Sequence, residues 1–531
     1  MTPEELAHAA AMSATQGPHD ARRTEPTRHL SWLRIIGVLA VVAAITVGSF
    51  ALRSSAHTAQ ASAPASSFMP YVDVTATPTF GFEDATQSQA TNVILGFIVS
   101  AKNQPCQASW GRAYTLADAG NQLDLDRRIA RLRQRGGEVA ISFGGQANDE
   151  LSTVCTDPAQ LVSAYSDVVA RYSADSIDLD IEGADASSPE ASARRADAMH
   201  ALQVQQKAAG RTLAVWLTLP VDPDGLTNSG RLVLTAMLNA KVDVAGVNGL
   251  TMDYGQSLPA GQTMAAASES ALTKLAGQLA TAYTAAGVRM DNEAAWQHVG
   301  ATPMIGQNDY STERFGLPDA ESLLAFAQQH HLRRLSMWSL NRDQSCGPNY
   351  ANVEVVSANC SGIEQQPSAF TKAFNAFTSG AVIPAATEGQ SPTATSSSSA
   401  RTNMVDDPAN SPYQIWSPVL PYAKATKVVW HHNVYEAKWW TLGDTPDDPV
   451  ATASDTPWTL VGPVLPGEHP APTPTLKVGT YPQWSAGQTY VAGQRVLFDG
   501  VGYQAKWYTH GDVPGMVVSD PGQTPWEHIT N

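Results

Sequence analysis

The sequence predicts an α/β protein in which a (β/α)8 TIM barrel is followed by two small all-β modules. Three observations indicate this. Short β-branched runs alternate with helical segments between residues 70 and 378, small and polar residues fill 379–411, and residues 412–531 contain an internal repeat. At 531 residues the chain is long enough for several domains.

The first segment, residues 1–69, contains the uncharged apolar run IIGVLAVVAAITVGSFAL at 35–52, with arginines concentrated on its N-terminal side. This charge bias keeps the N-terminus in the cytoplasm and sends the following chain outside. The run could be a cleaved signal peptide, with small-residue sites at 59–63, or an uncleaved membrane anchor. In both cases we expect an extracellular protein, secreted or anchored to the outer face of the cytoplasmic membrane. A buried core helix is the less favoured alternative.

The predicted barrel occupies residues 70–378. Its eight candidate strands begin near residues 71, 92, 138, 176, 212, 242, 301 and 333. Helices lie between them: Asp157 precedes a proline as a helix cap, and Asp319 suits a helix N-terminus. Eight strands alternating with helices are the composition of a (β/α)8 barrel.

The segment at 379–411 is nearly free of large apolar groups and is predicted to be a flexible linker. Beyond it, the run from Tyr435 to Pro446 reappears from Tyr503 to Pro514, an offset of 68 residues (503 − 435). The same offset relates Trp416 to Trp484, Tyr422 to Tyr490 and Trp458 to Trp526. Two copies of one module are therefore expected at 412–463 and 478–531, joined by the proline-rich linker 464–477.

The composition limits the partners. With 49 acidic and 33 basic residues the net charge is −16, which argues against nucleic acid and suits a neutral or weakly basic polymer. No metal, phosphate or cofactor motif stands out, so we expect no metal and no cofactor. We also expect a monomer.

The four cysteines of an exported chain suggest two disulfides, for which three pairings exist. Cys106 with Cys155 and Cys346 with Cys360 are favoured because each pair would join loops at the same end of neighbouring strands. Four buried free thiols are the alternative.

The run DSIDLDIE at 175–182 is the main candidate for chemistry. Successive strand residues point to opposite faces, so Asp178, Asp180 and Glu182 share one face while isoleucine and leucine occupy the other. A half-buried antiparallel strand with its acids in water would show the same alternation. The surrounding strand and helix pattern favours a parallel strand covered on both faces, where three acids would be costly unless functional.

At these residues the chain resembles glycoside hydrolase family 18, the chitinases. The family motif D-x-x-D-x-D-x-E is matched by Asp175, Asp178, Asp180 and Glu182, and the resemblance includes an SxGG run on the third strand and a tryptophan ending the eighth: Ser142, Gly144, Gly145 and Trp338. It implies that Glu182 protonates the leaving oxygen and later activates water. It also implies that Asp180 holds the 2-acetamido group and that Asp178 couples to Asp180 through a shared proton, while Asp175 supports the strand entry.

Further site residues follow from the same resemblance. Met252 stands where many members carry a tyrosine and Asp253 keeps their aspartate, so Tyr254 becomes the candidate hydroxyl for the acetamido group; a core role is its alternative. Trp338 would form the floor under the cleaved sugar. Weaker candidates for sugar contacts are Gln307 and Asn308, and Ser142 is expected to bond near Asp178 rather than act as a nucleophile.

The repeated module resembles carbohydrate-binding families 5 and 12, which share the run Y-x-A-K-W-W/Y. Trp439, Trp440, Trp507 and Tyr508 are the predicted chitin contacts, unless one of each adjacent pair is a core residue. Two linked modules would gain avidity on a repetitive polymer.

The sequence thus predicts an exported chitinase that binds chitin and N-acetylglucosamine oligosaccharides. Asp180 and Glu182 approach from one side, so neither suits the role of nucleophile, and the family resemblance implies retaining catalysis assisted by the substrate's own acetamido carbonyl. The short segment 310–332 between the last two strands leaves no room for an inserted wall domain, so an open cleft and endo action are expected. An endo-β-N-acetylglucosaminidase acting on other glycans and a non-catalytic chitin lectin are the alternatives.

Overall fold

The computed structural model describes residues 66–350, 352–377, 405–448, 454–470, 475–515 and 524–529. All of the described residues lie in one compact unit of the chain, 65–531. The predicted apolar run at 35–52 and most of the predicted linker at 379–411 lie outside the described residues. Within those residues, no helix is both long enough and apolar enough to cross a membrane.

The eight predicted strands form the parallel part of one sheet, and each pairs with the next along the chain. They are β2 (Tyr71–Asp73), β3 (Val93–Ala101), β6 (Val139–Gly144), β7 (Ser176–Asp180), β8 (Ala214–Asp222), β10 (Val244–Leu250), β11 (Val299–Thr302) and β14 (Arg334–Leu335). A short strand β1 (Ser67–Phe68) pairs in parallel with β14, two residues before β2 pairs with β3. Residues 67–73 therefore contain the first of the parallel strands and pair with both the second, β3, and the last, β14.

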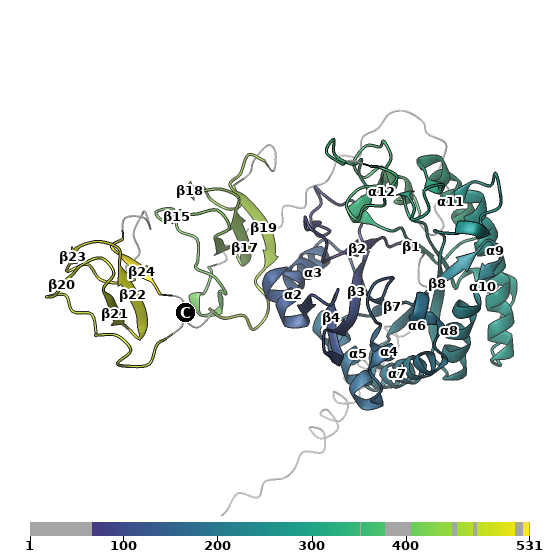
Figure 1. The fold of residues 1–531 in the computed structure, drawn as a ribbon, viewed down its shortest axis with the longest axis horizontal. Coiled ribbons are helices and arrows are strands. Elements are labelled where there is room, and N and C mark those ends of the chain that lie inside the picture. The colour runs from purple at the N-terminus through teal and green to yellow at the C-terminus, as the bar shows by residue number, and fades with distance from the viewer. Residues whose placement is uncertain are drawn as a thin grey trace, which may run out of the picture. The chain divides into compact units, whose positions relative to one another are not determined.

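Helices surround this sheet (Figure 1). They are α2 (Leu116–Gln122), α3 (Leu125–Gln134), α4 (Leu151–Val154), α5 (Pro158–Tyr172), α6 (Gly183–Ser187), α7 (Pro189–Ala208), α8 (Asn228–Asn239), α9 (Met264–Ala285), α10 (Asn292–Trp296), α11 (Leu317–Gln329) and α12 (Ala369–Phe374). The predicted caps are present. Asp157 accepts the backbone N–H groups of Ala159 and Gln160 at the start of α5, and Asp319 accepts that of Gly316 at 2.8 Å at the start of α11.

Several short strands were not predicted. After β3 the chain turns back as the antiparallel strand β4 (Gln104–Trp110) and then β5 (Tyr114–Thr115), while β9 (Gly225–Leu226), β12 (Gly306–Gln307) and β13 (Arg314–Phe315) form small hairpin pairs. These runs are too short or too polar to show a period of two. They lie beyond the parallel strands and build the loops around the candidate site.

The acidic strand β7 is buried on both faces. Ile177, Leu179 and Ile181 are fully buried in the core that the helices cover. Asp178 and Asp180, on the opposite face, are 0% and 3% exposed. The acids therefore face the interior of the sheet, and the alternative of an antiparallel strand with its acids in water is wrong.

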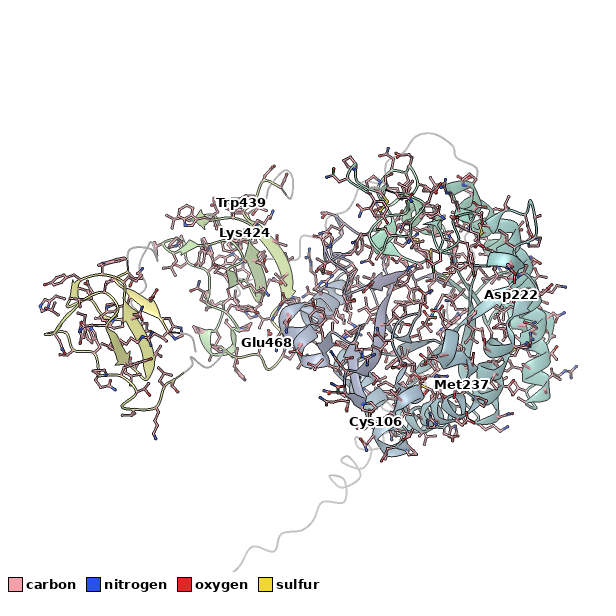
Figure 2. All side chains as sticks on the ribbon, in the orientation of Figure 1. Cys106, Asp222, Met237, Lys424, Trp439 and Glu468 are labelled. Carbon is pink, nitrogen blue, oxygen red and sulfur yellow. A yellow bond between two sulfur atoms is a disulfide. The ribbon has the colours of Figure 1, made fainter. Side chains whose placement is uncertain are left out.

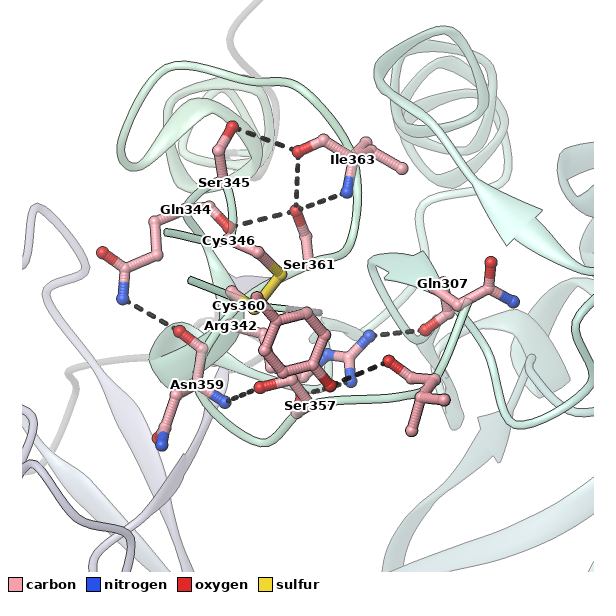
Figure 3. The surroundings of a disulfide bond; sticks show 12 residues. Gln307, Arg342, Gln344, Ser345, Cys346, Ser357, Asn359, Cys360, Ser361 and Ile363 are labelled. Carbon is pink, nitrogen blue, oxygen red and sulfur yellow. Dashed lines mark hydrogen bonds between the residues drawn. A yellow bond between two sulfur atoms is a disulfide. The ribbon is translucent and has the colours of Figure 1, made fainter. Parts of the chain in front are cut away.

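Both disulfides have the pairing that the sequence favoured, Cys106 with Cys155 and Cys346 with Cys360. The second lies in the segment after β14, where the Arg342 guanidinium donates to the carbonyls of Ser357, at 2.6 Å, and Gln307, also at 2.6 Å (Figure 3). This segment is thereby fixed against the loop that follows β11.

Removing the first disulfide with Cys106→Ala and Cys155→Ala is expected to lower the free energy of unfolding by up to about 4 kcal/mol, against about 3 kcal/mol for Cys346→Ala with Cys360→Ala. The difference follows from the sequence separations, 49 and 14 residues, because the longer loop restricts the unfolded chain more. Calorimetry of the two double variants checks the order. A larger loss for the shorter loop would contradict this account.

The two C-terminal copies have the same strands and the same core. The first contains β15 (Pro421–Tyr422), β16 (Lys427–Trp430), β17 (Asn433–Ala437), β18 (Thr441–Leu442) and β19 (Trp458–Pro463); the second contains β20 (Thr489–Tyr490), β21 (Arg495–Phe498), β22 (Val501–Ala505), β23 (Thr509–His510) and β24 (Trp526–His528). In each copy a three-stranded and a two-stranded antiparallel sheet form. Trp458 and Trp526 occupy equivalent core positions, and each indole N–H donates at 2.8 Å to the carbonyl of an aspartate fourteen residues earlier.

The predicted sugar-binding aromatics lie on the surface of both copies. Trp439, which Figure 2 labels, is 45% exposed and Trp440 is 60% exposed; Trp507 and Tyr508 are 43% and 67% exposed. The alternative that one of each adjacent pair is a core residue is therefore wrong.

Candidate active site

A cavity of about 260 Å³ lies at the C-terminal ends of the parallel strands. Five residues predicted from the sequence line it: Asp180, Glu182, Met252, Asp253 and Trp338. This is the edge at which barrels of this type carry their reactive groups. The cavity is therefore the candidate active site.

Asp180 ends β7 and is buried at the base of the cavity. Burial raises the pKa of its carboxyl well above the ordinary value, and the charges of Glu182 and Asp178 raise it further. One of its buried oxygens, Oδ1, has no hydrogen-bond partner among the described residues. A buried acceptor without a donor is costly, so this oxygen is suited to receive an N–H or O–H group from a ligand.

Glu182 stands two residues further on, at the N-terminus of α6, and its side chain makes no cap bond there. Its carboxyl is thus available to the cavity that it lines. Burial raises the pKa of Glu182 to about 7, with further contributions from the charges of Asp253 and Asp309. A carboxyl with such a pKa is protonated in about half of the molecules at neutral pH and can act as a general acid.

Asp178 lies beneath the cavity and does not line it. Its two oxygens are occupied by four side chains: Tyr71 at 2.7 Å, Ser142 at 2.8 Å, Thr218 at 2.7 Å and Arg334 at 3.2 Å. None of these four partners is Asp180, and the proton predicted to be shared between the two aspartates stays a prediction. Asp178 acts on Asp180 through its charge and through the position of the strand.

The Ser142 hydroxyl donates to Asp178, as the sequence predicted. Ser142 does not line the cavity, so it is not a substrate contact. Asp175 is exposed before the start of β7, where its carbonyl accepts the N–H of Ala214 at 2.9 Å. Both residues support the strand and neither reaches a ligand.

Tyr254 was predicted wrongly as the acetamido contact. The ring is 5% exposed and its hydroxyl donates to Ser268 at 3.3 Å, away from the cavity lining. The core alternative is the correct one. Met252 and Asp253 line the cavity instead, and burial raises the pKa of the Asp253 carboxyl to about 6.

Gln307 and Asn308 were also predicted wrongly as sugar contacts. They are 1% and 0% exposed, and their side-chain amides donate to backbone carbonyls of their own loop. The next residue, Asp309, is exposed and lines the cavity. The polar stretch after the seventh strand thus does supply a site residue, one position later than predicted.

Aromatic rings form one wall of the cavity. Trp338 stacks on Phe97 with ring centroids 5.5 Å apart and an angle of 24° between their planes, and Tyr71 lies 6.0 Å from both rings. All three residues line the cavity. The sequence identified only Trp338, although Tyr71 and Phe97 lie on the first and second predicted strands.

Polar lining residues were missed as well, namely Asp73, Thr75, Gln146, Asn148 and Asp309. They sit at or just beyond the ends of predicted strands, which is the signal that could have identified them. A buried and a half-buried acid at the end of one parallel strand, beside an aromatic wall, are typical of glycoside hydrolases built on TIM barrels.

Comparisons with known proteins show which proteins this chain resembles. The chain is 32% identical over 321 residues to a probable bifunctional chitinase/lysozyme of Escherichia coli, covering 59% of this chain and 34% of that protein. It is 32% identical over 283 residues to endochitinase 11 of Metarhizium anisopliae, covering 52% of each. The chain therefore spans about a third and about half of these two relatives.

The structure also resembles the catalytic domain of a hyperthermophilic chitinase from Pyrococcus furiosus, with a TM-score of 0.50 and 28% identity, covering 59% of this chain and 96% of that one. Residues 483–527 match the model of carbohydrate-binding module family 5/12. The resemblance to a family 18 chitinase region followed by a C-terminal carbohydrate-binding module is thus confirmed.

Proposed function

We propose that this protein hydrolyses β-1,4 bonds between the N-acetylglucosamine units of chitin by substrate-assisted, retaining catalysis. The observation that carries this proposal is the unpartnered, buried Oδ1 of Asp180 two residues from Glu182. A 2-acetamido group offers the N–H that this oxygen lacks. Once bound there, the acetamido carbonyl is directed toward the anomeric carbon of the same sugar.

Each step then has a group to perform it. Glu182 gives its proton to the glycosidic oxygen as the bond to the anomeric carbon breaks, and the acetamido carbonyl forms the new bond to that carbon. The oxazolinium formed carries a positive charge, which the negative charge of Asp180 stabilises. Glu182, now ionised, takes a proton from the water that opens the ring, so the anomeric configuration is retained.

The proposal is tested by incubating the protein with insoluble chitin and with a soluble tetramer of N-acetylglucosamine. We expect oligomers of mixed length from the polymer, as endo action requires, and products that appear first as the β-anomer in proton NMR. Products appearing first as the α-anomer would contradict retention. Cleavage of glycoprotein glycans but not of chitin would favour an endo-β-N-acetylglucosaminidase, and binding without cleavage a chitin lectin.

The value of kcat/KM on the tetramer is expected to fall as pH rises through about 7, because Glu182 must be protonated to act and its pKa is raised to that value. Asp253→Asn removes a negative charge that raises this pKa, so the fall should begin at lower pH in that variant. Initial rates between pH 4 and 10 provide the measurement. A profile that does not move, or that moves upward, would overturn the assignment of Glu182 as the acid.

We also propose that both C-terminal copies bind chitin. The support is their common core and the exposed rings at equivalent positions, together with the family match of the second copy. Trp440→Ala or Tyr508→Ala should each weaken binding to insoluble chitin about tenfold, since stacking one ring on a sugar is worth on the order of 1–2 kcal/mol. The control is Val419→Ala, which removes another exposed side chain of the first copy. Unchanged binding isotherms for both aromatic variants would exclude these rings as the contacts.

Three further features belong to the proposal. Residues 67–73, paired with both β14 and β3, support a closed eight-stranded barrel. The apolar run at 35–52 and the two disulfides support export, with the protein secreted or anchored at the membrane. We also propose a monomer, because the acids and rings on which the proposed cycle relies all belong to one chain.

A further inference from the structure

A hydrogen bond crosses the mouth of the candidate active site. The Gln146 amide, in the loop after β6, donates to the Asp309 carboxylate, in the loop after β11, at 3.2 Å. Both residues line the same cavity as Asp180 and Glu182. Three parallel strands, β7, β8 and β10, separate β6 from β11, and β14, β2 and β3 separate them in the other direction. In the closed barrel that we propose, the two loops therefore lie across the ring of strands from each other.

The bridge separates the acids from the aromatic wall. On one side of the line from β6 to β11, Glu182 follows β7 and Asp253 follows β10. On the other side, Trp338 follows β14 and Phe97 lies in β3. A sugar that stacks on Trp338 and reaches Glu182 has to cross this line. The Gln146 amide and the Asp309 carboxylate stand on this line and line the same cavity.

The loop of Asp309 is held in place by its backbone. The N–H of Asp309 donates to Asp253 Oδ1 at 2.7 Å, and that of Gln307 donates to the Ser361 carbonyl at 2.7 Å. Arg342 holds the Gln307 carbonyl from the other side (Figure 3). The carboxylate thus projects from a fixed support.

The loop of Gln146 is held as closely. The N–H of Gly145 donates to the Asp180 carbonyl at 2.8 Å, and at Gly144 a Cβ would lie 2.1 Å from the same oxygen. Only glycine allows this approach, at a φ of 99°. The backbone of the Gln146 loop is therefore tied directly to the end of the catalytic strand.

The two side chains, in contrast, are exposed. Their mutual bond is one that sugar hydroxyls or an acetamido group can replace, since the amide is a donor and the carboxylate an acceptor. We propose that Gln146 and Asp309 form a substrate-binding clasp: they bond to each other in the empty cleft and exchange that bond for contacts to the incoming N-acetylglucosamine chain. This inference rests on the proposed function and names two binding residues for it.

The test compares Gln146→Ala and Asp309→Ala with Ser311→Ala, an exposed residue of the same loop that does not line the cavity. We expect KM for the N-acetylglucosamine tetramer to rise three- to tenfold in Gln146→Ala and about tenfold in Asp309→Ala, because the second variant loses a charged acceptor. In Gln146→Ala, kcat should stay within twofold of the wild-type value. In Ser311→Ala, both kcat and KM should stay within twofold of the wild-type values. Melting temperatures of all three variants should match the wild type.

Binding is measured separately in a Glu182→Gln background by calorimetric titration with the tetramer. Adding Gln146→Ala should weaken the affinity by the same factor by which KM rises. If the wild type cleaves the tetramer while Gln146→Ala leaves KM and affinity unchanged, the clasp is refuted and the proposed function stands. If the wild type neither cleaves nor binds the tetramer, both proposals are refuted.

Discussion

Replacing Glu182 by Gln is expected to lower kcat about a thousandfold while chitin binding remains. The amide keeps the size and hydrogen-bonding capacity of the acid but has no proton to give, and general acid catalysis is worth about 10²–10⁴ in rate. The pKa of Glu182 is raised to about 7, so this carboxyl can hold a proton at working pH. The loss of kcat should therefore be specific to replacing this carboxyl. Steady-state kinetics on the soluble tetramer and binding isotherms on insoluble chitin measure the two effects.

The matched control is Glu190→Gln, an exposed glutamate in the first turn of α7 outside the cavity lining. It should behave as the wild type in both assays. Residual activity of Glu182→Gln within tenfold of the wild type would show that another group protonates the leaving oxygen. Asp253 would then be the next acid to replace, since its pKa is also raised, to about 6.

Replacing Asp180 by Asn is expected to lower kcat about 10²- to 10³-fold, the usual loss when a preorganised electrostatic contact to the transition state is removed. The same change should not lower the melting temperature. Burial raises the pKa of this carboxyl above its ordinary value, so its ionised form opposes folding at neutral pH, and a neutral amide of equal size relieves that cost.

Asp175→Asn serves as the control, because Asp175 belongs to the same acidic run but is exposed before the strand. Its kcat and melting temperature should match those of the wild type. Calorimetry and initial rates on the same preparations provide the comparison. A loss of both activity and stability in Asp180→Asn would mean that the residue supports the fold rather than the reaction.

Where a strand is regular, the alternation of polar and apolar residues was sufficient to predict which face each side chain occupies. In the run 175–182 it placed Asp178 and Asp180 on the inner face, and the structure has them there. Beyond β10, which ends at Leu250, the prediction of Tyr254 came from the family alignment, and it was wrong. Asp253 has a φ of 53°, so the chain turns, Met252 and Asp253 both face the cavity, and Tyr254 points into the core. A sequence pattern does not reveal such a turn when the residue is not glycine.

The C-terminal modules also contain site residues that lie outside regular strands. Trp439 and Trp440 follow the end of β17 at Ala437 and precede β18, so strand alternation does not apply and both rings are exposed. The loop after β11 is a further place where the sequence pattern did not separate structural residues from site residues. Gln307 and Asn308 satisfy the carbonyls of their own loop, while Asp309 remains exposed. Which polar side chain serves the loop and which serves a ligand depends on its backbone geometry, and the sequence does not contain that information directly.

The four partners of Asp178 link the reaction to the completion of the fold. They come from the first, third, fifth and eighth parallel strands, so the aspartate on the fourth is fixed only when residues from Tyr71 to Arg334 are all in place. A nascent or proteolytically shortened chain that lacks β14 leaves this carboxylate without its arginine. If the proposed function holds, catalytic activity will report on a complete set of parallel strands, and a fragment that has not finished folding will not degrade polymer.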